Sequence, residues 1–304
     1  MIRFITDTFG NKLLLALLGV SLIPLIAMGS AMYYLASQAL MYEASNRLEA
    51  VRTIKAAQVE DYFQLIHDQI QSFSGNRMVV EATEAFEAAM ATAGDESGVT
   101  PEQLAQLKAE LRTYYEIDFA SEYRNRNQSG NPNVDLLLNG LDDDSVYLQY
   151  QYIKKNPHPL GSKDLLDAAD DDSQYSVLHG KFHPVVRDYL NRFGFYDIFL
   201  VDIDSGDIVY SVYKELDYAT SLKNGPYAST GIGRAFQDAA AANVNDYVAF
   251  IDYEAYTPSY EEAASFLASP IFDGDRKVGV AIFQLPIARI NAIMAERTGL
   301  GKTG

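Results

Sequence analysis

The chain has 304 residues, and 48% of them are apolar, which is enough to bury a core and excludes a disordered protein. The formal net charge of −17 would repel phosphate backbones, so nucleic acid is excluded as a partner. Because cysteine is absent, disulfides, thiolate zinc sites and cysteine nucleophiles are excluded as well.

The first predicted element is an apolar segment at residues 13–35, which contains no charged residue. About 20 apolar residues cross the hydrocarbon core of a bilayer, so we predict a single transmembrane helix here. Arg3 and Lys12 precede the segment and the first basic residue after it is Arg47, a bias that keeps residues 1–12 in the cytoplasm. We therefore expect a protein of the cell inner membrane, with the rest of the chain on the periplasmic, extracytoplasmic side.

A cleaved signal peptide is the competing interpretation of this segment. The small residues Ala27 and Gly29 could form a cleavage site. The apolar run is, however, longer than the usual apolar region of a signal peptide, which has about 7–15 residues. No break separates the run from the helix that follows, which favours the membrane anchor.

Residues 36–194 are predicted to be mainly helical, as a stalk followed by a helical region. Thr100 and Gln103 have the spacing of an N-terminal capping box, and Gly194 suits the end of the last helix. Within the stalk, apolar residues recur at the four-three spacing of a helix that packs on a partner. This seam consists of Val59, Phe63, Ile66, Ile70 and Phe73. The partner is either a second chain, in a homodimer, or another element of the same chain.

The pattern changes from helical to alternating in residues 195–290. Two strands, a helix and three further strands in this order predict a five-stranded antiparallel sheet that covers a small pocket, as in PAS-like modules. The predicted strands are residues 196–202, 208–213, 247–252, 264–272 and 278–285, with an Ala-rich helix between the second and third. The fold class is therefore α+β.

Five segments carry a resemblance to a known family. They are LQYQYIKKNPHPLGSK (148–163), YSVLHGKFHPVVRDYLNRFGFYDIFLVD (175–202), GDIVYSVYKELDYATSL (206–222), GPYASTGIGRAF (225–236) and SFLASPIFDGDRKVGVAIFQLPIARINAIM (265–294). These segments lie within residues 148–294, about half of the chain, and resemble the extracytoplasmic Cache sensors, particularly the double-Cache regions of methyl-accepting chemotaxis proteins.

The resemblance implies that residues 195–290 are the membrane-distal Cache module and that residues 291–304 lead to a second module, which is missing from this sequence. It also implies a small-ligand sensor in a transmembrane receptor for signal transduction, and a chemotaxis transducer is the leading expectation. Sensors of this type also precede histidine kinases, nucleotide cyclases, diguanylate cyclases and phosphatases. The remaining alternative is a structural, membrane-tethered protein without a ligand.

Small-ligand pockets combine apolar walls with a few well-placed polar groups, and the predicted sheet region is rich in both. Lys214 and Asp217 are the charged candidates, as partners for a carboxylate and an amine of the ligand. For each tyrosine, a hydroxyl that merely caps the core is an equally good interpretation. The predicted ligand-binding residues are Tyr210, Tyr213, Lys214, Asp217, Tyr227, Asp252, Tyr256 and Ser259.

No catalytic residues, metal or cofactor are predicted. His179 and His183 have the i, i+4 spacing of two metal ligands, but no third ligand is evident near them. The acidic runs 142–144 and 170–172 lack the spacing of a calcium loop and are expected to be solvated. Asp202 belongs to a DxD sequence that resembles an aspartyl phosphatase motif, but the chain turns straight back into a strand, which favours a hairpin turn. No nucleophile, base and orienting group converge, so we do not expect an enzyme.

Overall fold

The computed structural model describes residues 9–127 and 130–296. Parts of the predicted cytoplasmic segment, 1–12, and of the predicted connector, 291–304, lie outside the described residues. The described helices are α1 (Phe9–Ser74), α2 (Arg77–Met90), α3 (Ala93–Glu96), α4 (Pro101–Tyr114), α5 (Ala120–Arg126), α6 (Val134–Asn139), α7 (Asp143–Gln149), α8 (Gln174–Phe193), α9 (Gly231–Ala241) and α10 (Ile287–Ala295). Two π-helical segments, Tyr115–Phe119 and Tyr150–Lys154, follow α4 and α7.

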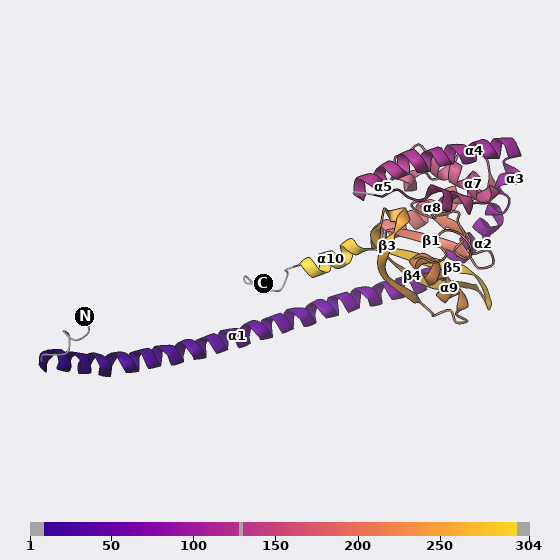
Figure 1. Ribbon diagram of the computed structural model, residues 1–304. Helices are drawn as coiled ribbons and strands as arrows, with labels where there is room; N and C mark the ends of the chain where they lie inside the picture. Colours follow the sequence, from indigo (N-terminus) through magenta and orange to yellow (C-terminus); the bar gives the residue numbers. More distant parts are fainter. Residues whose placement is uncertain (1–8, 128–129, 297–304) are drawn as a thin grey trace. The chain divides into compact units, whose positions relative to one another are not determined.

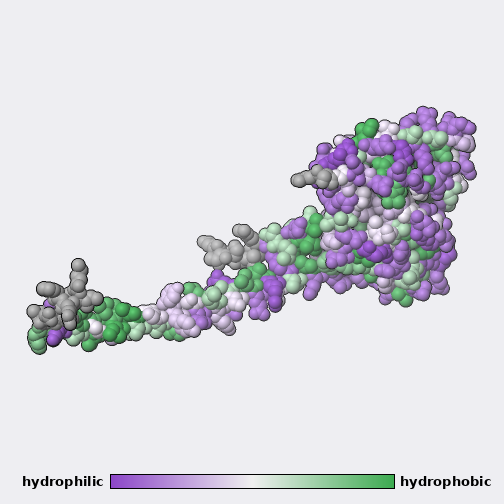
Figure 2. Space-filling view, viewed as in Figure 1, coloured by the Kyte–Doolittle hydropathy of each residue, from purple (hydrophilic) through white to green (hydrophobic). Residues whose placement is uncertain are grey.

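The predicted membrane segment and stalk form one continuous helix, α1, of 66 residues with Pro24 inside it. This helix is long and apolar enough to cross a membrane. At 1.5 Å per residue it is about 100 Å long, roughly three times the thickness of a hydrocarbon core. Figure 2 shows hydrophobic side chains around its N-terminal part and more hydrophilic ones further along. Only the first part of α1 therefore has the composition of a membrane span.

The chain divides into two compact units, one with α1 up to Glu60 and the other comprising Asp61–Ala295. The second unit contains the end of α1, the other helices and the sheet. Its five strands are antiparallel and lie in the order β2-β1-β5-β4-β3 (Figure 1). The α+β class and the five-stranded antiparallel sheet are thus confirmed. The strands are β1 (Asp197–Asp202), β2 (Ile208–Ser211), β3 (Ala249–Tyr256), β4 (Glu262–Asp273) and β5 (Arg276–Pro286).

One face of the sheet is covered by the end of α1, by α2 and by α8. The ring centroid of Phe73 lies 5.2 Å from that of Phe283 on β5, and Ser74 forms a 2.9 Å hydrogen bond with Ser269 on β4. Phe63 contacts Phe250 on β3 with ring centroids 5.1 Å apart. The seam from Phe63 to Phe73 therefore packs on the sheet of its own chain, which was one of the two expected partners.

The opposite face of the sheet is covered by α9 and by the loops around it. This face, which we call the inner face, carries Gln284 of β5 and Asp197 of β1, which are cross-strand partners. Figure 1 shows α9 next to β4 and β5, while α3, α4 and α7 lie together at the top of the unit. Cross-strand partners point to the same face, so the register assigns each strand residue to the helix-covered or the inner face.

The predicted local signals are present. Thr100 and Gln103 form the capping box at the start of α4, and Gly194 ends α8 with a left-handed φ of 75°. Asp202 accepts hydrogen bonds from the backbone N–H groups of Asp204 and Ser205, so the DxD sequence forms a hairpin turn.

The second strand differs from its prediction, 208–213, because it ends at Ser211. There the buried carboxylate of Asp197 accepts hydrogen bonds from the N–H groups of Val212 and Tyr213, at 2.8 and 3.2 Å, and draws the chain out of the strand. Val212 and Tyr213, which the prediction placed in this strand, therefore lie beyond its end.

Candidate functional site

The candidate site is built around the segment that follows β2, residues 212–219, which we call the site loop. Lys214 and Ala219 have left-handed backbone angles, with φ of 58° and 61°. These conformations are uncommon for residues other than glycine and persist only where surrounding contacts enforce them. Gln149 of α7 supplies such contacts, because its side-chain amide donates hydrogen bonds to the carbonyls of Leu216 and Tyr218 at 3.3 and 2.6 Å. The loop is held on both sides of Asp217.

Asp217 is completely buried in the site loop. Its Oδ2 accepts a 2.6 Å hydrogen bond from the hydroxyl of Tyr256, at the end of β3. Its Oδ1 is also buried and has no partner with hydrogen-bond geometry among the described residues. The backbone N–H groups of Asp217 and Tyr218 lie near this carboxyl and partly offset the effect of burial on its pKa. Burial raises the pKa of this carboxyl from 3.8 to about 6.

Glu215 forms a second acidic group two residues earlier. Its carboxylate accepts hydrogen bonds from Tyr196 at 2.8 Å and from Ser259 at 3.3 Å. Ser259 in turn accepts a 2.9 Å hydrogen bond from the side-chain amide of Gln284 on the inner face. Burial, and next the negative charge of Asp217, raise the pKa of Glu215 well above its ordinary value.

Two further polar atoms next to this network have no partner within residues 9–127 and 130–296. One is the hydroxyl of the buried Tyr227, whose ring meets that of Tyr256 edge-on with centroids 5.9 Å apart. The other is Oε1 of Gln284, which is buried on the inner face. Buried polar groups are almost always hydrogen-bonded, so unpartnered atoms beside Asp217 mark a place where a polar ligand or water is expected.

Lys214 belongs to a different environment. Its Nζ donates hydrogen bonds to the carbonyls of Ser211 and Val212. Its ammonium lies against three aromatic rings, and burial lowers its pKa. The distances from Nζ to the ring centroids are 4.7 Å for Tyr210, 5.4 Å for Tyr218 and 5.7 Å for Tyr152.

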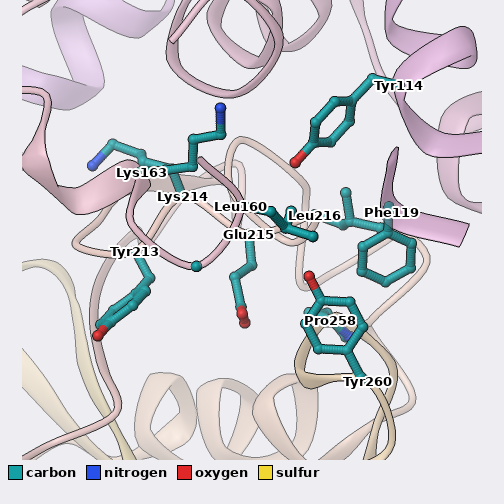
Figure 3. Close-up of a pocket in the computed structure, with 11 residues that line it drawn as sticks. Tyr114, Phe119, Leu160, Lys163, Tyr213, Lys214, Glu215, Leu216, Pro258 and Tyr260 are labelled. Carbon is teal, nitrogen blue, oxygen red and sulfur yellow. The ribbon is translucent and has the colours of Figure 1, made fainter. Parts of the chain in front are cut away.

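A small cleft opens beside the site loop (Figure 3). Its volume of about 20 Å³ is room for roughly one water molecule. Figure 3 shows the hydroxyls of Tyr114 and Tyr260 directed into the cleft, with Leu160 between them. The lining residues are Tyr114, Phe119, Leu160, Gly161, Lys163, Tyr213, Lys214, Glu215, Leu216, Pro258 and Tyr260.

The segment of residues 156–169, which we call the strap, contributes Leu160 to this cleft and is tied to α8. His183 donates from Nε2 to the carbonyl of Asp164 at 2.6 Å, and its Nδ1 accepts from Tyr210 at 2.7 Å. Arg187 donates to the same carbonyl at 2.5 Å. Burial lowers the pKa of His183 to about 2, so its imidazole is neutral. The imidazole flagged by its metal-like spacing thus connects the strap, α8 and β2.

The eight predicted site residues divide into groups. Asp217, Tyr227, Tyr256 and Ser259 come together on the inner face. Tyr213, which is half-buried, and Lys214 line the cleft beside them. Tyr210 lies on the helix-covered face, since its partner Leu200 pairs with Ala281, and it stacks on Phe86 of α2 with ring centroids 5.1 Å apart.

Asp252 is not part of this arrangement, because it is exposed on β3 at an irregularity in the pairing with β4. Other residues of the site were not predicted. Glu215 was passed over although it lies between Lys214 and Asp217 and, in a straight strand, would share a face with Asp217. Gln149 and Gln284 were missed because no local motif marks an amide that acts across the fold.

The acidic runs have local structural roles. Asp142 caps α7 by accepting a hydrogen bond from the N–H of Ser145 at 2.8 Å. Asp171 accepts from the N–H of Ser173, just before α8. No group of three or more His, Cys, Asp or Glu side chains suited to a metal ion occurs in the described part of the chain.

No family model matches the chain, and no curated protein matches it. Among solved structures it is similar to the sensor domain of the V. cholerae histidine kinase DctB, with 12% identity and a TM-score of 0.32, over 60% of this chain and 62% of that one. It is also similar to the ligand-binding domain of the Pseudomonas aeruginosa PAO1 amino acid chemoreceptor PctC in complex with GABA, with 17% identity and a TM-score of 0.28, over 45% and 56%. A third similar structure is the ligand-binding domain of the Campylobacter jejuni chemoreceptor Tlp3 in complex with L-valine, with 11% identity and a TM-score of 0.30, over 65% and 68%. The chain thus spans about three fifths of the length of the first two structures, and likeness at these scores carries no conclusion about function.

Proposed function

We propose that this chain is the extracytoplasmic, small-ligand sensing part of a transmembrane signalling receptor, and that the receptor is a chemotaxis transducer. The ligand binds at the inner face of the sheet, between the site loop and the end of β3. The proposal assigns binding and not catalysis to this site. The same sensing domain could also belong to a receptor whose output module is a histidine kinase or a cyclase.

The observation that carries the proposal is the unpaired carboxylate oxygen of Asp217. A buried acidic group without an ionic partner destabilises a folded protein, and such groups persist where they have a function. The left-handed backbone at Lys214 and Ala219 fits the same explanation, because strained backbone concentrates at ligand sites. A purely structural protein has no use for either feature.

The sheet offers a route from the site to α1. Gln284 on the inner face and Phe283 on the opposite face are neighbours on β5, and Phe283 packs against Phe73 of α1. A ligand that prefers one of two packings by about 1–3 kcal/mol would change their ratio by roughly five-fold to 150-fold. That range is sufficient for a graded receptor.

The test is a thermal-shift screen of the full chain in lipid nanodiscs, with amines, amino acids, organic acids and sugars. A ligand of the native state stabilises by RT ln(1 + [L]/Kd), so the melting temperature should rise with ligand concentration. Tyr256→Phe, which removes the hydroxyl donor to Asp217, should weaken the response. Absence of any response in a broad screen would favour the structural tether.

A further inference from the structure

We infer that the Glu215–Asp217 pair is a receptor for an ammonium group, and that the ligand is an organic amine without a carboxylate. This inference rests on the proposed sensing function and specifies the chemistry of the ligand. It is carried by the charges around the site, by the number of unpartnered acceptors and by the orientation of the nearby lysines.

The charges around the site loop are unbalanced. Asp197, Glu215 and Asp217 are three carboxyl groups that act on one another electrostatically, and the ammonium of Lys214 acts on Asp197. None of the three carboxyls forms an ion pair in the described parts of the chain. Burial raises the pKa of all three carboxyls, so their negative charge develops as pH rises, and that of Asp217 is present at pH 8. An added cation would satisfy the ionised groups, whereas an added anion would be repelled by them.

The carboxylate of Asp197 is already used within the fold, because it accepts backbone hydrogen bonds from Ile198, Val212 and Tyr213. The charge of Lys214 acts on this same carboxyl. Glu215 and Asp217 are therefore the two acidic groups left to meet a cationic ligand.

The unpartnered atoms match an ammonium group in number. Asp217 Oδ1 and Gln284 Oε1 are acceptors, and the hydroxyl oxygen of Tyr227 can accept as well. A primary ammonium has three N–H donors and no acceptor. Two sets of contacts hold these atoms. Tyr256 donates to Asp217 and contacts the ring of Tyr227, while Gln284 is connected to Glu215 through Ser259. The negative charge of Asp217 acts on Glu215 and relates the two sets.

The two lysines that line the cleft already donate to carbonyl groups of the fold. Lys214 directs its ammonium to the carbonyls of Ser211 and Val212 and to the tyrosine rings. Lys163 donates to the carbonyl of Asn156 at 2.9 Å. The ammonium of Lys163 also lies 6.0 Å from the ring centroid of Tyr114, so it faces a cleft wall while it is bonded to this carbonyl (Figure 3). The sequence-based role of Lys214 as a carboxylate partner therefore has no support in the geometry.

The cleft beside Glu215 suits the apolar part of such a ligand. Its walls include Phe119, Leu160, Tyr213 and Tyr260, which offer apolar and aromatic surface for an alkyl chain. Because the cleft has a volume of only about 20 Å³, a ligand must displace Leu160 and with it part of the strap. Binding would thus be coupled to a movement of the strap.

The experiment compares three molecules of equal chain length, n-butylamine, 4-aminobutyrate and butyrate, on the full chain in nanodiscs at pH 8. We expect n-butylamine to raise the melting temperature and to bind more tightly than 4-aminobutyrate, and butyrate not to bind. Asp217→Asn keeps the shape of the side chain and should weaken n-butylamine binding by about tenfold or more, because a charged hydrogen bond becomes a neutral one. Glu215→Gln should weaken it as well, and it serves as the second variant if Asp217→Asn does not fold.

Asp238→Asn is the matched control, because Asp238 is an exposed carboxylate on α9, and it should leave binding unchanged. The inference is overturned if n-butylamine does not bind, if it binds Asp217→Asn and Glu215→Gln as tightly as the unaltered chain, or if 4-aminobutyrate binds more tightly. Binding of butyrate, or binding of 4-aminobutyrate that is tighter than that of n-butylamine, would overturn the amine preference, and if Tyr256→Phe weakens this binding the sensing function stays intact. If none of the three molecules binds and the broad screen is also negative, the amine preference and the proposed sensing function are both wrong.

Discussion

At the scale of single residues, Asp217 is the side chain whose environment differs most from that of an ordinary acidic residue. One of its oxygens accepts from Tyr256 and the other is buried without a partner in the described residues. Acidic groups stabilised by neighbours usually have lowered pKa values, but burial raises that of Asp217 to about 6. Its charged form is therefore destabilised in the folded protein.

This shift predicts a pH-dependent effect of Asp217→Asn on stability. The folded state holds the proton more tightly than the unfolded state, so the contribution of Asp217 to stability declines as pH rises from about 4 to about 6 and then stays low. A shift from 3.8 to about 6 corresponds to up to about 3 kcal/mol. Asn accepts the Tyr256 hydrogen bond without a charge, so we expect this variant to be more stable than the unaltered chain at pH 8 and similar to it at pH 4.

Chemical denaturation at the two pH values, followed by circular dichroism, measures this difference. Asp238→Asn, at an exposed position, should show no such pH dependence. A loss of stability in Asp217→Asn that is equal at pH 4 and pH 8 would contradict the account, because it would mean that the charge itself is not destabilising.

At the scale of elements, glycine residues allow some of the helices around the site to approach neighbouring loops closely. α9 approaches the preceding loop so closely that a Cβ at Gly233 would lie 2.3 Å from the carbonyl oxygen of Ala228. At Gly180 of α8, by contrast, a Cβ would meet Ala168 at an ordinary 3.5 Å. Both glycines lie within helices, so substitutions at the two positions share the effect of helix propensity and differ in the effect of close packing.

We predict opposite effects for alanine at these two positions. Gly180→Ala should stabilise by up to about 1 kcal/mol, because alanine is the better helix former. Gly233→Ala should destabilise by about 1–3 kcal/mol, because the added methyl group forces α9 away from the loop. Thermal unfolding of both variants measures the two changes in stability. Equal effects would contradict the prediction, because they would show that α9 can move away from the loop without loss of stability.

The connection between α8 and the strap leads to a second prediction at this scale. His183→Phe keeps an aromatic ring but leaves the Asp164 carbonyl with one donor fewer and the Tyr210 hydroxyl without its acceptor. Unpaired buried polar groups destabilise by about 1–3 kcal/mol each. We expect faster amide hydrogen exchange in residues 156–169, measured by mass spectrometry, with less change in β4 and β5. His158→Gln, at a half-buried position of the strap itself, should leave the exchange rates unchanged.

At the scale of the whole molecule, the chain joins an apolar helical segment to a strongly acidic unit. Residues 13–35 carry no charge, whereas the full chain has a formal net charge of −17. An acidic surface disfavours nucleic acid and is compatible with a soluble ligand-binding domain anchored to a membrane. The orientation of the anchor depends on the basic residues Arg3 and Lys12 on its N-terminal side.

This charge bias predicts the compartment of the acidic unit. Alkaline phosphatase fused after Gly304 should be active in cells, because this enzyme requires the periplasm, and a cytoplasmic reporter at the same position should be inactive. Fractionation should recover the fusion with the membrane, whereas a soluble, shortened product would indicate a cleaved signal peptide. The reverse reporter pattern would overturn the orientation.

The sequence alone determined the features that depend on neighbouring residues. Local patterns predict the apolar span, the capping box at Thr100, the end of α8 at Gly194 and the five strands. The structure contains these helices, caps and strands at nearly the expected positions. Asp217 and Tyr256 were selected from the sequence as polar groups in an apolar region, and the structure shows that they are hydrogen-bonded to each other.

Only the tertiary structure decided which of the candidates meet. The carboxylate of Asp197 ends β2 two residues early, which breaks the alternation and directs Lys214 to the tyrosine rings instead of to a ligand. Sheet register assigned Tyr210 to the helix-covered face and Gln284 to the inner face. Contacts such as these join residues far apart in the chain, and their geometry follows from the packing of the whole unit, which no local pattern records.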